Sequence, residues 1–234
     1  MKTDDQLDLQ ALHRVRSRLV GQRTAVVNQI RSFLLERGIT VRQGLRFLRQ
    51  QLPDILAKRC DVLSPCMTRI IEDLSDDWRR LDERIQHITE EIEVLAHGSE
   101  SCRQLMTVPG VGPIIASAMV AAIGNGTAFA KGRDFAAWLG LTPKDHSTGG
   151  RQRLGGITKA GDSILRSTLI VGATALLRHI RKGRHKPTPW LASLLGRKPP
   201  KLVAVALANK FARIAWRLMI SGGVYKQPVA AMPT

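Results

Sequence analysis

The chain has 234 residues, enough to bury a sizeable core, and a formal net charge of +17. The excess lies entirely in residues 101–234, which hold 20 basic and 3 acidic side chains, whereas residues 1–100 balance 16 against 16. A segment this cationic predicts a polyanionic partner, of which nucleic acid is the commonest. The longest uncharged apolar run, Val111–Gly124, is shorter than the roughly 20 residues of a membrane-spanning helix, and the residues after Met1 are polar. We therefore expect a cytoplasmic protein with no membrane partner.

The first hundred residues predict a helical arm. Apolar residues recur at three- and four-residue steps from Leu9 to Leu35, and a second, shorter helix runs from Leu45 to Ile55 with an interruption at Pro53. A stricter seam follows, in which steps of four and three alternate: Leu74, Trp78, Leu81, Ile85, Ile88, Ile92 and Leu95. This repeat predicts a coiled coil, with a long helix of an ordinary bundle as the alternative. Its partner is either the first helix, in an antiparallel hairpin, or another protomer.

A second domain is predicted to begin near residue 101, where acidic residues vanish and glycine and alanine become frequent. Its first motif is Pro109-Gly-Val-Gly between two apolar helical stretches, which is typical of a helix-hairpin-helix. In such a motif Gly110 and Gly112 let a tight turn, and the amides that begin the next helix, approach a phosphate. The alternative is a purely structural turn between two helices that uses the same glycines.

The stretch that carries chemistry is residues 144–162, which follow a helix that ends at Gly140. Its five glycines and four cationic residues cannot pack a core, so we expect a surface loop or a tight β-hairpin. The hydroxyl groups of Ser147 and, as the next choice, Thr148 are candidate nucleophiles for a phosphodiester. His146 or Asp145 is the neighbouring group that is placed to assist.

The residues after these hydroxyls fit the same chemistry. Gly149 and Gly150 permit close approach of the backbone, and Arg151 and Arg153 can clamp a phosphate and stabilise its developing charge. A basic, glycine-rich loop that binds phosphate passively is the alternative interpretation.

The remaining residues predict two long helices and more cationic surface. Asp162 is expected to cap the first helix, and the second runs from Leu202 to Met219 with one apolar stripe. The basic segment 178–187 between them is either a solvated linker or a phosphate-binding segment. Contacts with the DNA backbone are predicted for these further cations of the basic half: Lys159, Arg166, Arg181, Lys182, Arg184, Lys186, Lys210 and Arg213.

Together these patterns predict a mainly α protein. A long helical coiled-coil arm for assembly (residues 1–100) precedes a compact helical domain (101–226) that contains the helix-hairpin-helix and the Gly-rich basic loop or hairpin, and residues 227–234 form a flexible tail. The cysteines show no CxxC spacing and the histidines form no ligand pair, so neither a metal site nor another cofactor is predicted in this chain.

Four motifs in this order resemble the transposases of the IS110 insertion-sequence family, relatives of the Piv DNA invertase. They are Val108–Pro113, Trp138–Pro143, Ser147–Asp162 and Asn209–Trp216, and the helical arm is also similar, so the resemblance covers nearly the entire chain. The resemblance implies DNA transposition or site-specific recombination by a serine that becomes covalently joined to DNA. That serine corresponds to Ser147 or, with a one-residue shift, to Thr148. It also implies that a structured guide RNA selects the DNA sites.

The resemblance further implies an amino-terminal RuvC-like domain with an acidic, metal-binding tetrad, which is not found in this sequence. We therefore expect the chain to match the carboxy-terminal two-thirds of a transposase, as a truncated copy whose divalent metal would lie in the missing domain. It would self-associate, or join a full-length transposase, through the coiled coil. The second class of function is a non-catalytic nucleic-acid-binding assembly factor, or an inhibitor of a full-length transposase.

Overall fold

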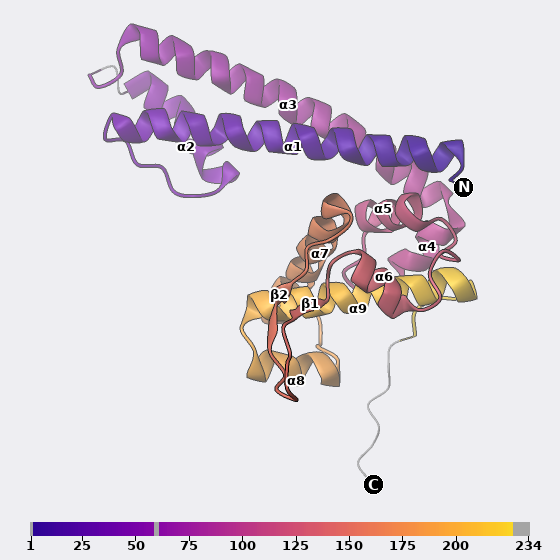
Figure 1. Ribbon diagram of the computed structural model, residues 1–234. Coiled ribbons are helices and arrows are strands. Elements are labelled where there is room, and N and C mark those ends of the chain that lie inside the picture. The colour runs from indigo at the N-terminus through magenta and orange to yellow at the C-terminus, as the bar shows by residue number, and fades with distance from the viewer. Residues whose placement is uncertain (1, 59–60, 227–234) are drawn as a thin grey trace. The chain divides into compact units, whose positions relative to one another are not determined.

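The computed structural model describes residues 2–58 and 61–226; the tail predicted over 227–234 lies outside the described residues. The described chain is mainly helical, as the apolar periodicities predict (Figure 1). The helices are α1 (Asp4–Glu36), α2 (Leu45–Lys58), α3 (Pro65–Gly98), α4 (Glu100–Met106), α5 (Pro113–Ile123), α6 (Gly132–Trp138), α7 (Ser163–Arg181), α8 (Pro189–Arg197) and α9 (Pro200–Ser221). Two short strands, β1 (Pro143–Asp145) and β2 (Leu154–Ile157), pair antiparallel.

The chain divides into two compact units. Arg14–Glu90 form one of them, called the arm here, and the residues before and after this range form the other, called the main unit. Within the described ranges, no helix has both the length and the apolar character that crossing a bilayer requires.

In the arm, α1 and α3 run antiparallel. Two polar contacts show this direction: Arg16 Nε donates to Thr89 Oγ1 at 2.8 Å, and Arg23 Nη1 pairs with Asp82 Oδ1 at 2.9 Å. One buried cluster joins apolar side chains of α1, α2 and α3, and Trp78 of the regular α3 seam belongs to it. Arg16 and Arg23 of α1 thus contact α3 beside this seam, while pairing of the seam in a coiled coil with another protomer stays a prediction.

The interruption predicted at Pro53 is wrong, because α2 continues through this residue. A proline inside a helix removes one backbone hydrogen bond and costs about 3 kcal/mol. Leu48 and Leu52 on the same helix are buried in the arm cluster. Burial of two leucine side chains is worth about 3–6 kcal/mol, which offsets the cost of the proline.

The main unit is built around α9. This helix contacts α4, α6, α7 and α8, and its predicted apolar stripe is buried at Val203, Leu207, Phe211 and Leu218. Helix α5 is apolar nearly all round and buries most of its residues against α4 and α7. The unit therefore has one continuous core beneath its cationic surface.

Helix α8 was not predicted. Thr188 Oγ1 accepts a hydrogen bond from the amide of Leu191 at 3.4 Å, and Pro189 occupies the first helical position. A threonine cap followed by proline is a known signal for the start of a helix. This signal was not used, because the basic segment 178–187 before it was interpreted only as a solvated linker or a phosphate-binding segment.

Candidate functional site

The glycine-rich stretch forms a β-hairpin, one of the two forms expected for it. At its tip Thr148 and Arg151 pair as an antiparallel bridge, with the amide of Arg151 donating to Thr148 O at 3.0 Å. Gly149 and Gly150 between them have φ of +55° and +75°. Two successive positive φ values define the type I′ turn that matches the twist of a hairpin, and glycine adopts them without strain. The tip is exposed, as a surface hairpin requires.

Ser147 is exposed and lies on the side of the hairpin that precedes the Gly149–Gly150 turn. Its hydroxyl group has two hydrogen-bond partners. The hydroxyl donates to Asp145 Oδ1, whose carboxylate also accepts the Ser147 amide at 2.8 Å. The amide of Arg153, from the opposite side of the hairpin, donates to Ser147 Oγ at 3.0 Å. A hydroxyl held between a carboxylate and an amide donor has both a proton acceptor and a group that can stabilise negative charge on its oxygen.

Of the two neighbours considered as helpers of Ser147, Asp145 is the one hydrogen-bonded to it. Asp145 Oδ1 accepts the amide of the residue two positions along the chain, an Asx turn that brings the carboxylate to the Ser147 hydroxyl. The His146 ring packs beside Gly155 of β2, where an added Cβ would lie 3.6 Å from His146 Cδ2. The tip pairing likewise places Arg151 on the face of Thr148. The phosphate clamp by the side chains of Arg151 and Arg153 stays a prediction.

The Ser147 hydrogen bonds lower the pKa of the Asp145 carboxyl, the side-chain bond more than the backbone bond. Such bonds to the ionised form stabilise the fold above the unfolded-state pKa, and this contribution is lost as the pH falls through the folded value. In Ser147→Ala we expect the pKa of Asp145 to rise part of the way to its ordinary value, because the backbone bond remains. NMR titration of the carboxyl measures it. Thr148→Ala is the control and should leave it unchanged; equal values in Ser147→Ala and the parent chain would contradict this geometry.

Two glycines form the base of the hairpin. Gly140 follows α6 and Gly161 precedes the cap of α7, and both have φ of +66°. A Cβ on Gly161 would lie 1.9 Å from Trp138 O, and one on Gly140 would lie 2.3 Å from the amide nitrogen of Ala160. The backbone at residues 138–140 and the backbone at residues 160–161 therefore lie too close together to leave room for a side chain at either glycine.

Lys159 and Arg166, both predicted to bind phosphate, make structural contacts at this base. Lys159 has a left-handed φ of +59°, and its amide donates to Gly140 O at 3.1 Å. Arg166 Nη1 donates to Leu139 O at 3.1 Å and to Ala160 O at 2.6 Å, which ties the end of α6 to the hairpin. Arg166 is thus a positioning residue for the hairpin, and phosphate contact by either side chain stays a prediction.

The turn between α4 and α5 contains the Pro-Gly-Val-Gly motif. A Cβ on Gly110 would lie 2.9 Å from Phe211 Cζ and 3.1 Å from Leu176 Cβ, so Gly110 lets the turn pack closely on α7 and α9. Gly112 caps α5 and has open space beside it. Packing therefore accounts for Gly110, while Gly112 leaves room at the helix N-terminus. Phosphate binding by this turn stays a prediction.

The basic segment 178–187 lies at the end of α7. Arg181 occupies the last turn of this helix and Lys182 its C-cap, where cations interact favourably with the helix dipole. The side chains of Arg181, Lys182, Arg184 and Lys186 are all exposed. The segment is thus an exposed cationic surface, as both interpretations of it require.

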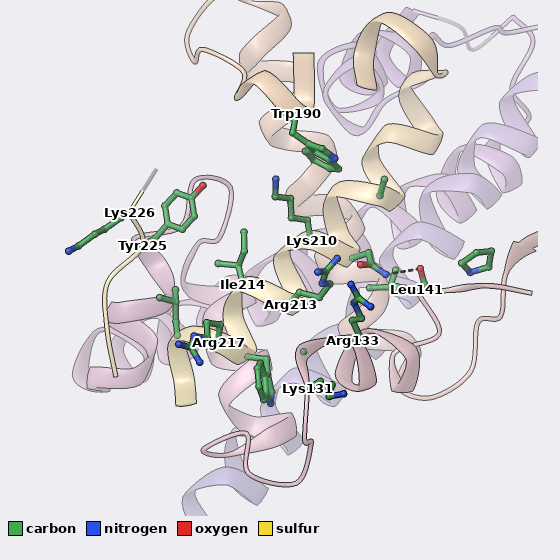
Figure 2. Close-up of a pocket in the computed structure, with 16 residues that line it drawn as sticks. Lys131, Arg133, Leu141, Trp190, Lys210, Arg213, Ile214, Arg217, Tyr225 and Lys226 are labelled. Atoms are coloured by element: carbon green, nitrogen blue, oxygen red, sulfur yellow. Dashed lines mark hydrogen bonds between the residues drawn. The ribbon is translucent and has the colours of Figure 1, made fainter. Parts of the chain in front are cut away.

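A groove of about 1010 Å³ runs beside α9 (Figure 2). It brings Lys210 and Arg213, both predicted to contact phosphate, together with Trp190 of α8 and with Tyr225 beyond α9. Its basic lining residues are Lys131, Arg133, Lys210, Arg213, Arg217 and Lys226. In the part of the chain that the structure describes, no aspartate or glutamate lines it. The groove therefore combines positive charge with aromatic rings.

The three carboxylates of residues 101–234 are bonded locally. Asp134 Oδ2 accepts the amide of Lys131 at 3.1 Å, Asp162 Oδ1 accepts the amide of Ile164 at 2.9 Å as the predicted cap of α7, and Asp145 accepts Ser147. They serve turns and helix starts. The cationic side chains of this half thus leave a strongly positive surface. Among the described residues, no group of three or more His, Cys, Asp or Glu could hold a metal ion.

Comparison with known proteins identifies the family. The profile described as "Transposase IS116/IS110/IS902 family" matches residues 102–187. The chain is 46% identical to a putative transposase, y4pF/y4sB, of Sinorhizobium fredii over 97% of this chain and 58% of that protein. It is 42% identical to a probable family 20 transposase of Pseudomonas aeruginosa over 97% of this chain and 67% of the relative. It is also 39% identical to the transposase for insertion sequence element IS1111A of Coxiella burnetii, over 96% and 62% respectively.

The chain belongs to the IS116/IS110/IS902 transposase family. It spans between 58% and 67% of the length of these three relatives. The part matched by the family profile includes the α4–α5 turn and the whole hairpin with Ser147. The α9 side of the groove lies beyond that part.

Sequence reasoning missed several residues of this transposase-family site. The close contacts at Gly140 and Gly161 join positions about twenty apart, and no local pattern marks them. Lys131 and Arg133 line the groove from the start of α6. Their positive charge was the only signal in the sequence that could have identified them as groove residues. The Thr188-Pro189 pair that precedes Trp190 is a signal for the start of a helix and could have placed Trp190 in its first turn.

Proposed function

We propose that this chain acts in DNA transposition as a recombinase whose Ser147 attacks a phosphodiester. The observation that carries the proposal is the hydrogen bonding of an exposed serine to the carboxylate of Asp145 and the amide of Arg153. Membership of a transposase family supports DNA as the substrate. The positive surface of residues 101–226 supplies the attraction that a phosphate backbone needs.

In the proposed step Ser147 is the nucleophile and Asp145 is the proton acceptor. Ser147 Oγ forms a bond to phosphorus, and its proton passes to the Asp145 carboxylate. One phosphorus–oxygen ester bond of the strand breaks, and the released sugar oxygen takes up a proton from water while Asp145 returns its proton to the solvent. The strand is then held as a phosphoserine ester. The Arg153 amide stabilises the negative charge on Ser147 Oγ as its proton leaves, and neighbouring cations stabilise the charge on the attacked phosphate.

Contacts with the DNA backbone are proposed at three places around this serine. The hairpin contributes Gly149, Gly150, Arg151 and Arg153, with Lys159 at its base. The α4–α5 turn contributes Gly112 and the helix start that it caps, while Gly110 acts by packing. The third place is the exposed surface formed by Arg181, Lys182, Arg184 and Lys186. Such contacts position the strand without reading its sequence.

Assembly and metal chemistry also belong to the proposal. The arm would join further transposase subunits through a coiled coil, with a structured guide RNA selecting the sites. A divalent metal would be bound by the RuvC-like domain of a longer family member, since the described residues contain no group of three or more His, Cys, Asp or Glu that could hold it. Since the chain matches about 58–67% of the relatives, the test includes a longer family member.

The test is detection of a covalent adduct with DNA. The chain is incubated with labelled ends of its insertion sequence, alone and with the Pseudomonas aeruginosa relative that carries alanine at the position aligned with Ser147. We expect an adduct that survives denaturing electrophoresis, and peptide mapping should place it on Ser147. An adduct on Thr148 would move the nucleophile by one residue. Binding without any adduct would contradict the proposal and favour a non-catalytic assembly factor.

A further inference from the structure

The groove beside α9 has the chemistry of a site for a polyanion. Arg213 and Arg217 are exposed on α9, one turn apart. Lys131, which precedes α6, and Lys226, which follows α9, also line the groove. Because the described lining residues include no carboxylate, these charges have no anionic partner among them. At about 1010 Å³ the groove matches the upper end of the roughly 300–1,000 Å³ range of small-molecule pockets. An extended ligand with several negative charges fits this lining better than one small anion.

Aromatic side chains narrow the class of ligand. Trp190 is 39% exposed although it lines the groove, and Lys210 Nζ lies 4.0 Å from the centroid of its ring. This cation–π contact holds the ring in place and leaves part of its surface open. Burial, and to a lesser extent the charge of Arg213, lowers the pKa of Lys210. Cations beside an exposed aromatic ring are typical of sites that bind unpaired nucleic-acid strands, where phosphates meet the charges and bases stack on the ring.

We propose that the groove binds an unpaired nucleic-acid strand, with its phosphates on Arg213 and Arg217 and one base stacked on Trp190 (Figure 2). A base inside a duplex is already stacked on its neighbours and cannot use the indole face. Pro143, where β1 begins, lines the same groove, so a strand bound there leads toward the hairpin that carries Ser147. The inference rests on the proposed function only for the nature of the partner, nucleic acid.

Binding of fluorescent oligothymidylate and oligouridylate of about ten nucleotides tests this site, with a duplex of equal length for comparison. Trp190→Leu should weaken single-strand binding about ten-fold, whereas Trp190→Phe should stay within about three-fold because its ring still stacks. The double variant Arg213→Gln, Arg217→Gln should lower the slope of log affinity against log salt by about 1.4. The oligomer that binds more tightly identifies the strand as DNA or RNA.

Two controls separate this site from general effects. Arg79→Gln with Arg80→Gln removes two exposed arginines of the arm and should leave the salt slope within error. Ser147→Ala should bind single strands like the parent chain, so failure of the serine chemistry and failure of the groove give different results. Circular dichroism verifies the fold of each variant. Equal losses in Trp190→Leu and Trp190→Phe, or tighter binding of the duplex, would overturn the proposal.

Discussion

Replacing Ser147 with alanine is expected to abolish the covalent adduct with DNA, a loss of about 10⁴-fold or more in the rate of its formation. The alanine keeps the backbone of the hairpin but has no oxygen to attack phosphorus. The amide of Arg153 loses its acceptor, and since this part of the hairpin is exposed, water replaces it at little cost. Quantitative gel analysis of the adduct over time measures the effect.

Variants of the neighbouring residues make this prediction specific. Asp145→Asn keeps a hydrogen-bond acceptor but cannot take up the serine proton efficiently, so it should slow the adduct about 10²-fold. Thr148→Ala should have a small effect, because the Thr148 side chain has no role in the proposed step. DNA affinity should equal that of the parent chain in the two alanine variants and should not fall in Asp145→Asn, which removes a negative charge. An adduct that persists in Ser147→Ala and vanishes in Thr148→Ala would show that Thr148 is the nucleophile.

Replacing Gly161 with alanine should lower the free energy of unfolding by about 3–5 kcal/mol. A left-handed φ costs an L-residue about 1–2 kcal/mol by itself. The larger part comes from the Cβ, which would lie 1.9 Å from Trp138 O and would force the two backbone segments apart. Urea denaturation followed by circular dichroism measures the change.

Gly183→Ala is the matched control, because Gly183 has a similar φ of +71° but nothing within 4 Å of an added Cβ. It should cost only the conformational term, about 1–2 kcal/mol. Gly140→Ala should resemble Gly161→Ala, since its Cβ would meet the backbone of Ala160. Equal losses at Gly161 and Gly183 would mean that the close approach at the hairpin base is absent.

Local features of this protein could be predicted from the sequence. Asp162 was expected to cap α7 and does so through the amides of Ile164 and Leu165, and α9 buries the stripe that its spacing predicted. These features depend on hydrogen bonds between near neighbours and on a regular apolar repeat. The helix cap and the apolar repeat can both be recognised in the sequence without knowing which segments of the chain pack together.

Contacts between distant segments could not be predicted in this way. The sequence by itself determined the helical class, the balance of charge in residues 1–100 against the cationic excess in residues 101–234, and the hydroxyl-bearing glycine-rich stretch. Only the tertiary structure decided that His146 packs beside Gly155 of the opposite strand, that the backbone at Gly161 passes against Trp138, that the chain continues helical through Pro53, and that Trp190 shares a groove with Arg213. The physical reason is that these outcomes depend on strand faces, on the free energy of burial and on close approach of backbones, which exist only once the chain has folded.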